Sequence, residues 1–238
     1  MVCLTRMKKF WKNVKVIEIS DHHFEIYLDN KILKTPMKKD LCFENLDIAQ
    51  EICKEWDIDE KIIKPDNMIF YGLLSTAIDR IKFSRDSYIK DMIAFVDTDL
   101  ICYRSEKSFD LIELQKKSWD PVVSFIQNYT GEKINTCQGI MPLSQNKVLL
   151  SKLNIFIDKF SDQQISALHR MTYITGSIFI SICALKGDIL KSEAFTLSFL
   201  DEIWQAENWG IEEDAETKRD AISRELNKVI SFAELLRN

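Results

Sequence analysis

Two short runs near the N-terminus, Val14-Lys-Val-Ile-Glu-Ile19 and Phe24-Glu-Ile-Tyr-Leu28, decide the fold class. Both are rich in β-branched and aromatic residues and partly alternate with polar ones, which is typical of half-buried strands. Asp29-Asn30 follows at once and suits a tight hairpin turn into Lys31-Ile-Leu33. The chain is therefore predicted to begin as an antiparallel sheet.

After Thr35-Pro36 the apolar residues change from alternation to helical spacing. They recur at that spacing at Ile48, Ala49, Ile52, Cys53 and Trp56, which predicts a first helix packed on the sheet. Asn67–Ile81 and Ser87–Phe95 are predicted as the second and third helices. Asp97–Arg104 is predicted as a short buried strand or extended segment that closes the small sheet.

Helical signals dominate the remainder of the chain. Asp120-Pro121 has the residue types of an N-cap and a first helical position, and Gly131 is predicted to end that helix. Ser161-Asp-Gln-Gln164 has the spacing of a capping box and is predicted to open one long apolar helix that runs to Lys186-Gly187. In its middle, Gly176-Ser177 is predicted to let a neighbouring backbone come close.

Two more helices are predicted to pack around this one. The first covers Glu193–Asn208, and the last has an apolar stripe at Ala215, Ile222, Leu226, Val229, Ala233 and Leu236. The predicted fold class is α+β. A small N-terminal antiparallel β region with helices is expected over residues 1–105, followed by a mostly α-helical C-terminal domain over residues 106–238.

Charge and composition exclude several classes of function. The net charge of -5 gives no general attraction to phosphate backbones, so no nucleic acid is expected as a partner. The longest apolar run, Ile178–Leu185, is far shorter than the roughly 20 residues of a spanning helix, so no membrane insertion is expected. Met1–Lys9 lacks the apolar core of a secretory signal. The six cysteines contain no C-x-x-C pair, which favours a reducing compartment and no zinc site.

Residues suited to catalysis are few. His22 and His23 are neighbours in a strand-like stretch and would point to opposite faces, and His169 lies inside a predicted helix. Asp97 and Asp99 would share one side of an extended segment, as two carboxylates that bind a divalent cation do, or would serve as loop and cap residues. The sequence has no Gly-rich phosphate loop, nucleophile elbow or H-E-x-x-H motif. We predict a protein that is not an enzyme and has no cofactor, with a metal-dependent hydrolase using Asp97 and Asp99 as the alternative.

Asp201, Glu202 and Gln205 form a polar stripe on the otherwise apolar helix predicted over Glu193–Asn208. Such a stripe is either the solvated face that every amphipathic helix has or a surface that binds a partner.

Nine motifs in order resemble the series that marks one family. They are Phe10-Trp11-Lys12, Leu28-Asp29 with Lys34-Thr35-Pro36, Glu55-Trp56, Ile63-Lys-Pro65 with Asn67-Met68, Thr76-Ala77-Ile78-Asp79, Asp99-Leu-Ile-Cys-Tyr-Arg104, Gln115 with Trp119-Asp-Pro121, Thr175-Gly-Ser177, and Leu200-Asp-Glu-Ile-Trp-Gln205 with Trp209-Gly210. The family is that of assembly chaperones for the α subunit of the F(1) sector of ATP synthase, in mitochondria and α-proteobacteria. The resemblance extends from about Phe10 to about Glu216.

The resemblance implies a chaperone that binds the unassembled α subunit and shields the surface that β later contacts. A glutamate in the Leu-Asp-Glu-x-Trp-Gln motif is implicated in the family's function, so Glu202 is the first candidate for partner binding, followed by Asp201 and Gln205. A permanent adaptor subunit is a further alternative. Because mitochondrial members carry a presequence that this sequence lacks, a bacterial cytoplasmic member is expected, or a processed member of the mitochondrial matrix.

The remaining motif residues are expected to have mainly structural roles. Trp11, Trp56 and Trp119 are predicted in the core, and Trp204 and Trp209 are predicted to pack in the core or as a cap at the helix end. Arg104 has two alternatives, a surface contact or an internal ion pair with Asp97 or Asp99.

Overall fold

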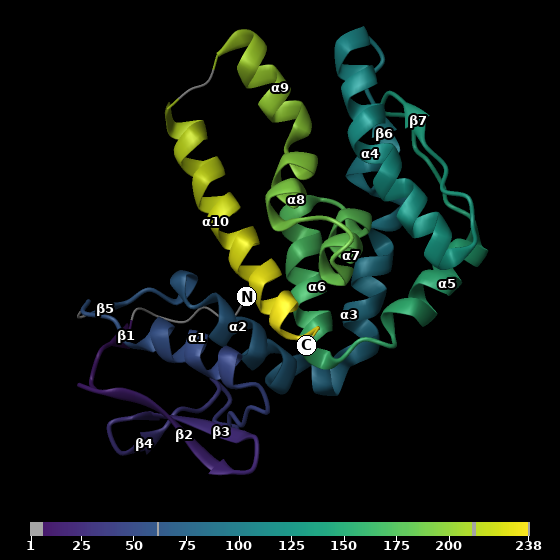
Figure 1. Cartoon of the computed structure of the whole chain (residues 1–238). Helices are drawn as coiled ribbons and strands as arrows, with labels where there is room; N and C mark the ends of the chain where they lie inside the picture. The colour runs from purple at the N-terminus through teal and green to yellow at the C-terminus, as the bar shows by residue number, and fades with distance from the viewer. Residues whose placement is uncertain (1–6, 61, 211–212, 238) are drawn as a thin grey trace. The chain divides into compact units, whose positions relative to one another are not determined.

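The computed structural model describes residues 7–60, 62–210 and 213–237 (Figure 1). Its contacts group into two compact units, one ending at Ser84 and one covering Arg85–Arg237. The division at residue 105 into two domains stays a prediction, since contact density does not test independent folding. The expected absence of a secretory signal concerns a segment whose first residues lie outside the described ranges.

The N-terminal unit is built on a three-stranded antiparallel sheet in the order β2 (Val14–Ser20), β3 (His23–Leu28) and β4 (Lys31–Ile32). Alternate residues of β3 are buried, which places Phe24, Ile26 and Leu28 in the core. At the turn Asp29 takes a positive φ of 54° and accepts hydrogen bonds from the backbone of Lys12 and Asn13. The predicted N-terminal antiparallel sheet is confirmed.

The predicted first helix is α1 (Leu46–Trp56), which packs on this sheet. Asn45 caps it by accepting from two backbone N–H groups of the first turn. After β5 (Ile62–Ile63), which pairs with β1 (Met7–Lys8), the chain forms η1 (Pro65–Asn67) and α2 (Ile69–Thr76). The Glu55 carboxylate accepts from the backbone N–H groups of Phe70 and Tyr71 and so satisfies the start of α2.

Asp79 joins the end of the unit to the segment that follows the sheet. It lies in η2 (Ala77–Ile81), is almost fully buried, and accepts from the Thr35 hydroxyl at 2.7 Å and from the Met37 backbone at 3.0 Å. The Lys39 ammonium lies 3.9 Å from the same carboxylate. This contact joins Thr35 of one motif to Asp79 of another.

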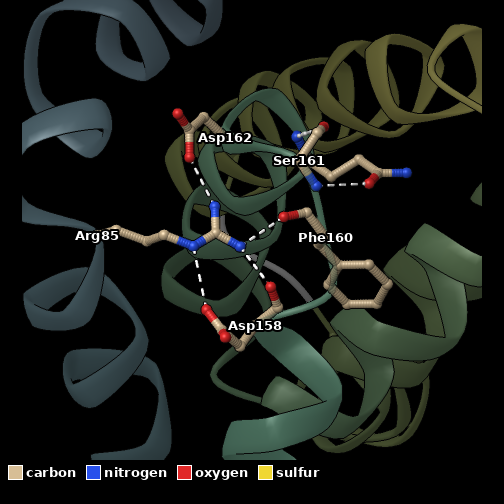
Figure 2. A network of polar contacts seen from close by, with 6 residues as sticks. Arg85, Asp158, Phe160, Ser161 and Asp162 are labelled. Carbon is tan, nitrogen blue, oxygen red and sulfur yellow. Dashed lines mark hydrogen bonds and ion pairs between the residues drawn. The ribbon is translucent and has the colours of Figure 1, made fainter.

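The helical unit begins within α3 (Lys82–Ala94), whose backbone is non-helical at Ser84. Arg85 holds the turn between α5 (Lys147–Ile157) and α6 (Asp162–Thr175), as Figure 2 shows. The segment predicted as a buried strand instead forms η3 (Val96–Thr98), η4 (Leu100–Cys102) and the short β6 (Tyr103–Arg104). The prediction that it closes the N-terminal sheet is wrong, because β6 pairs in parallel with β7 (Cys137–Gln138).

The next helix, α4 (Phe109–Thr130), starts earlier than predicted. Ser108 is its N-cap, so Asp120-Pro121 lies inside the helix and the predicted start there is wrong. Gly131 ends it in the left-handed conformation, as predicted.

At two places the sequence predicted one helix and the structure has two. Gly176, with a φ of 66°, ends α6, and α7 (Ile178–Lys186) follows, with every residue but its last, Lys186, buried. Phe199, with a φ of -113° and a ψ of 24°, separates α8 (Lys191–Ser198) from α9 (Leu200–Trp209). The capping box of α6 is confirmed, and so is the close approach at Gly176, whose carbonyl accepts from the backbone of Leu100 at 3.1 Å.

The last helix, α10 (Glu213–Leu235), packs on α6, α7 and α8 (Figure 1). The core of the unit therefore surrounds α7, which also contacts α4. Among the described residues no helix has both the length and the apolar character to cross a bilayer. The five described cysteines form no disulfide, and two of them, Cys102 and Cys183, are buried.

Candidate functional site

The three predicted partner-binding residues lie in the first two turns of α9. The break at Phe199 fixes where α9 starts, and Leu200 is buried while Ile203 and Trp204 are half-buried. Glu202 and Gln205 are exposed, three residues apart on one face. Within residues 7–60, 62–210 and 213–237, neither of these two side chains has a hydrogen-bond or ion-pair partner.

Asp201 differs from the other two because it points into the unit. Its carboxylate accepts a hydrogen bond of 2.8 Å from the side-chain amide of Gln115 in α4. The side-chain oxygen of Gln115 accepts in turn from the Ser105 backbone N–H at 2.8 Å, and Gln115 is only 1% exposed. The structure thus assigns Asp201 an internal partner, and leaves Glu202 and Gln205 as the accessible polar residues.

Arg104 and Trp119 pack next to the hydrogen bond between Gln115 and Asp201. One Arg104 nitrogen donates to the Gln115 backbone carbonyl at 2.8 Å, and another pairs with Asp120 at 3.1 Å. The guanidinium lies 5.0 Å from the centre of the Trp119 ring, and burial lowers the pKa of Arg104 from its ordinary value. The predicted alternative of an ion pair between Arg104 and Asp97 or Asp99 is wrong, because the arginine turns toward α4.

Asp97 and Asp99, the carboxylates of the alternative metal site, accept hydrogen bonds from backbone N–H groups. Asp99 is fully buried and accepts from the backbone N–H groups of Ile101 and Phe179, both at 3.2 Å, so it caps the start of α7. Burial raises its pKa to about 7. Asp97 accepts from the Gln145 backbone N–H at 2.8 Å. No group of three or more potential metal-ligating side chains occurs among the residues that the structure describes.

The histidines likewise have local surroundings. The His23 ring is 2.9 Å from the Asp21 carbonyl, and His22 lies 3.6 Å from the Asp21 carboxylate. The His169 ring packs between the rings of Tyr88 and Tyr173, and burial lowers its pKa. These contacts give the histidines no shared site.

The tryptophans divide into buried and exposed ones. Trp11, Trp56 and Trp119 are buried, as predicted. Trp204 is half-buried, and Trp209 is 73% exposed, so the prediction that Trp209 packs in the core is wrong. At the end of α9 the two rings meet edge to face, with ring centres 5.3 Å apart. The internal role of Gln115 was missed, although its place among the family motifs was a signal.

Similar proteins of known family identify the family of this chain. A profile of the family described as ATP12 chaperone protein matches residues 8–127. This chain belongs to the ATP12 chaperone family. The protein named atp12, mitochondrial, from Schizosaccharomyces pombe is 27% identical over 220 residues, which cover 87% of this chain and 75% of that protein.

Solved structures of similar proteins agree with the fold. Atp12 from Paracoccus denitrificans superposes with a TM-score of 0.85 at 26% identity, covering 96% of this chain and 97% of that one. The Atu1473 protein of Agrobacterium tumefaciens gives a TM-score of 0.88 at 31% identity, covering 97% of this chain and 87% of the other. The α+β fold class and the family resemblance are therefore confirmed. Membership in ATP12 makes the chain a chaperone of ATP synthase assembly.

Proposed function

We propose that this chain binds the unassembled α subunit of the F(1) sector and shields its β-contacting surface until β replaces the chaperone. The ATP12 family supports a role in assembly of this enzyme. An unassembled subunit exposes an interface that would otherwise aggregate, so a partner that covers it keeps the subunit soluble. The chaperone has to release that surface again, which favours a polar contact over a large apolar one.

The exposed pair Glu202 and Gln205 is the observation that carries this proposal. Both side chains are exposed and have no partner in the part of the chain that the structure describes, and the first turn of their helix is hydrogen-bonded to α4. A carboxylate and an amide on one face can accept and donate hydrogen bonds to a partner without first breaking internal ones. We assign Glu202 the main contact and Gln205 a supporting one, and Asp201 contributes through the position of α9.

The compartment is part of the proposal. We propose the bacterial cytoplasm, with the mitochondrial matrix as the alternative for a processed eukaryotic member; relatives of both origins are similar to this chain.

Co-expression with the cognate α subunit, in the absence of β, tests the function. We expect soluble α in the presence of the native chain and little with Glu202→Lys. Glu207→Lys is the matched control, because Glu207 is also exposed on α9 and the five-residue step turns it by about 140° from Glu202. Circular dichroism checks that each variant is folded. Insoluble α with the native chain contradicts the chaperone proposal, and co-purification of the chain with finished ATP synthase favours a permanent adaptor instead.

A further inference from the structure

We infer that Gln115 is a positioning residue, which sets the direction of α9 through its side-chain hydrogen bond to Asp201 and so presents Glu202 and Gln205 to the partner. This inference rests on the proposed function. Gln115 does not reach the surface itself, since it is 1% exposed within α4.

The chain alone does not fix the direction of α9. Phe199 interrupts the helical backbone, so α9 is not a continuation of α8. Phe199 also gives α9 no side-chain cap. In the described part of the chain, α9 packs mainly on α4 and α8. The direction of α9 therefore depends on its contacts with α4 and α8.

A hydrogen bond from Gln115 in α4 to Asp201 reaches α9. It joins residues 86 positions apart in the chain, and it holds the first turn of α9. Because successive residues of a helix are turned by about 100°, fixing the direction of Asp201 also fixes the directions of Glu202 and Gln205.

A second hydrogen bond holds α8 to the same part of α4. The Trp119 indole N–H donates to the Leu197 carbonyl at 2.8 Å, next to the break. Trp119 is one helical turn beyond Gln115, and both have Arg104 against them. The two bonds therefore flank the break at Phe199, one on α8 and one on α9.

Gln115 needs an amide for this role. It donates to a carboxylate and at the same time accepts from the Ser105 backbone N–H. A carboxylate at position 115 could still accept from Ser105 but would face the Asp201 carboxylate without a proton to share. Reversing the pair, with a carboxylate at 115 and an amide at 201, restores a donor and an acceptor in the same places.

The test compares four variants for the amount of cognate α subunit that co-purifies with the chain after co-expression without β. We expect Gln115→Glu to recover at least fivefold less α. Asp201→Asn should recover about as much as the native chain, since its side-chain oxygen still accepts from Gln115. The double variant Gln115→Glu with Asp201→Asn should regain most of the loss.

Asp201→Ala keeps the inference testable should Gln115→Glu fail to fold, because it removes the acceptor from a half-buried position. We expect it to lose α as Gln115→Glu does, with circular dichroism like that of the native chain. A native chain that recovers no α overturns the proposed function. If the native chain recovers α and folded Gln115→Glu recovers it equally, or the double variant shows no rescue, or Asp201→Ala matches Asp201→Asn, the positioning role is overturned and the function stands.

Discussion

Arg85 should contribute more to stability than a surface arginine usually does. Its side chain is 26% exposed, and Figure 2 shows its guanidinium directed into the turn between α5 and α6. It pairs with Asp158 at 3.1 Å and with Asp162 at 2.6 Å. The third guanidinium nitrogen, Nη2, donates to the backbone carbonyls of Asp158 at 2.7 Å and Phe160 at 2.6 Å. One side chain thus binds backbone carbonyls just after the end of α5 and a carboxylate in the first turn of α6.

The expected cost of Arg85→Ala follows from these four contacts. The two ion pairs involve half-exposed to exposed carboxylates and contribute about 0.2–1 kcal/mol each. The two hydrogen bonds to carbonyls contribute about 1 kcal/mol each, because their donor is charged but partly solvated. We expect a loss of about 3 kcal/mol in the free energy of unfolding for Arg85→Ala. Arg85→Lys should lose about 1.5 kcal/mol, because an ammonium cannot reach all four oxygens at once.

Urea unfolding followed by far-UV circular dichroism measures both losses, with an unchanged m value as the sign that the folded state is intact. Asp162→Asn is the matched control and should lose no more than about 1 kcal/mol, since it removes a single, partly exposed ion pair. High salt should reduce the cost of Arg85→Ala by less than half, because the bonds to carbonyls are not screened as ion pairs are. Stability of Arg85→Lys equal to that of the native chain would refute this reasoning.

Two further predictions concern buried carboxylates. Asp79→Ala should lower the free energy of unfolding of the N-terminal unit by about 3 kcal/mol, because it leaves the Thr35 hydroxyl and the Met37 N–H without their acceptor. The midpoint of thermal unfolding measures this loss, and a midpoint unchanged by the substitution contradicts the prediction. Burial raises the pKa of Asp99 to about 7, above its unfolded value of about 3.9, so the folded state binds the proton more tightly and stability should fall as pH rises from about 4 to about 7. Urea midpoints across that range should fall less in Asp99→Asn, and equal slopes for the two proteins count against this assignment.

Local patterns predicted most elements of the fold but not their ends. The alternation in β3 and the helical spacing in α1 depend on neighbouring residues alone, so sequence was enough for both. The helix breaks differ from each other. Glycine favours the left-handed conformation that Gly176 adopts, so the helix break there could be predicted from the sequence. Phe199 carries no such signal, and the apolar pattern continues across it, so one helix was predicted where the chain forms two.

The candidate site shows a similar limit. A polar stripe predicts which residues of a helix avoid the core, and Glu202 and Gln205 are exposed accordingly. It does not predict which member of the stripe has an internal partner, because that depends on a residue of another helix. Asp201 is bound by Gln115, and Asp99 by the start of α7, through contacts between segments far apart in the chain. Periodicity within one helix contains no information about either contact.

The separation of internal and exposed motif residues predicts two classes of substitution. Glu55, Asp79, Asp99 and Gln115 all bind groups inside the protein, where each satisfies a backbone N–H or a buried side chain. Changes there act first on folding or on the direction of an element, and reach the partner only through it. Glu202 has no side-chain partner among residues 7–60, 62–210 and 213–237, so a change there should alter partner binding while the free energy of unfolding stays within about 0.5 kcal/mol of the native value. A variant of Glu202 that unfolds the chain would therefore place this residue with the internal class and remove the basis for assigning it the contact.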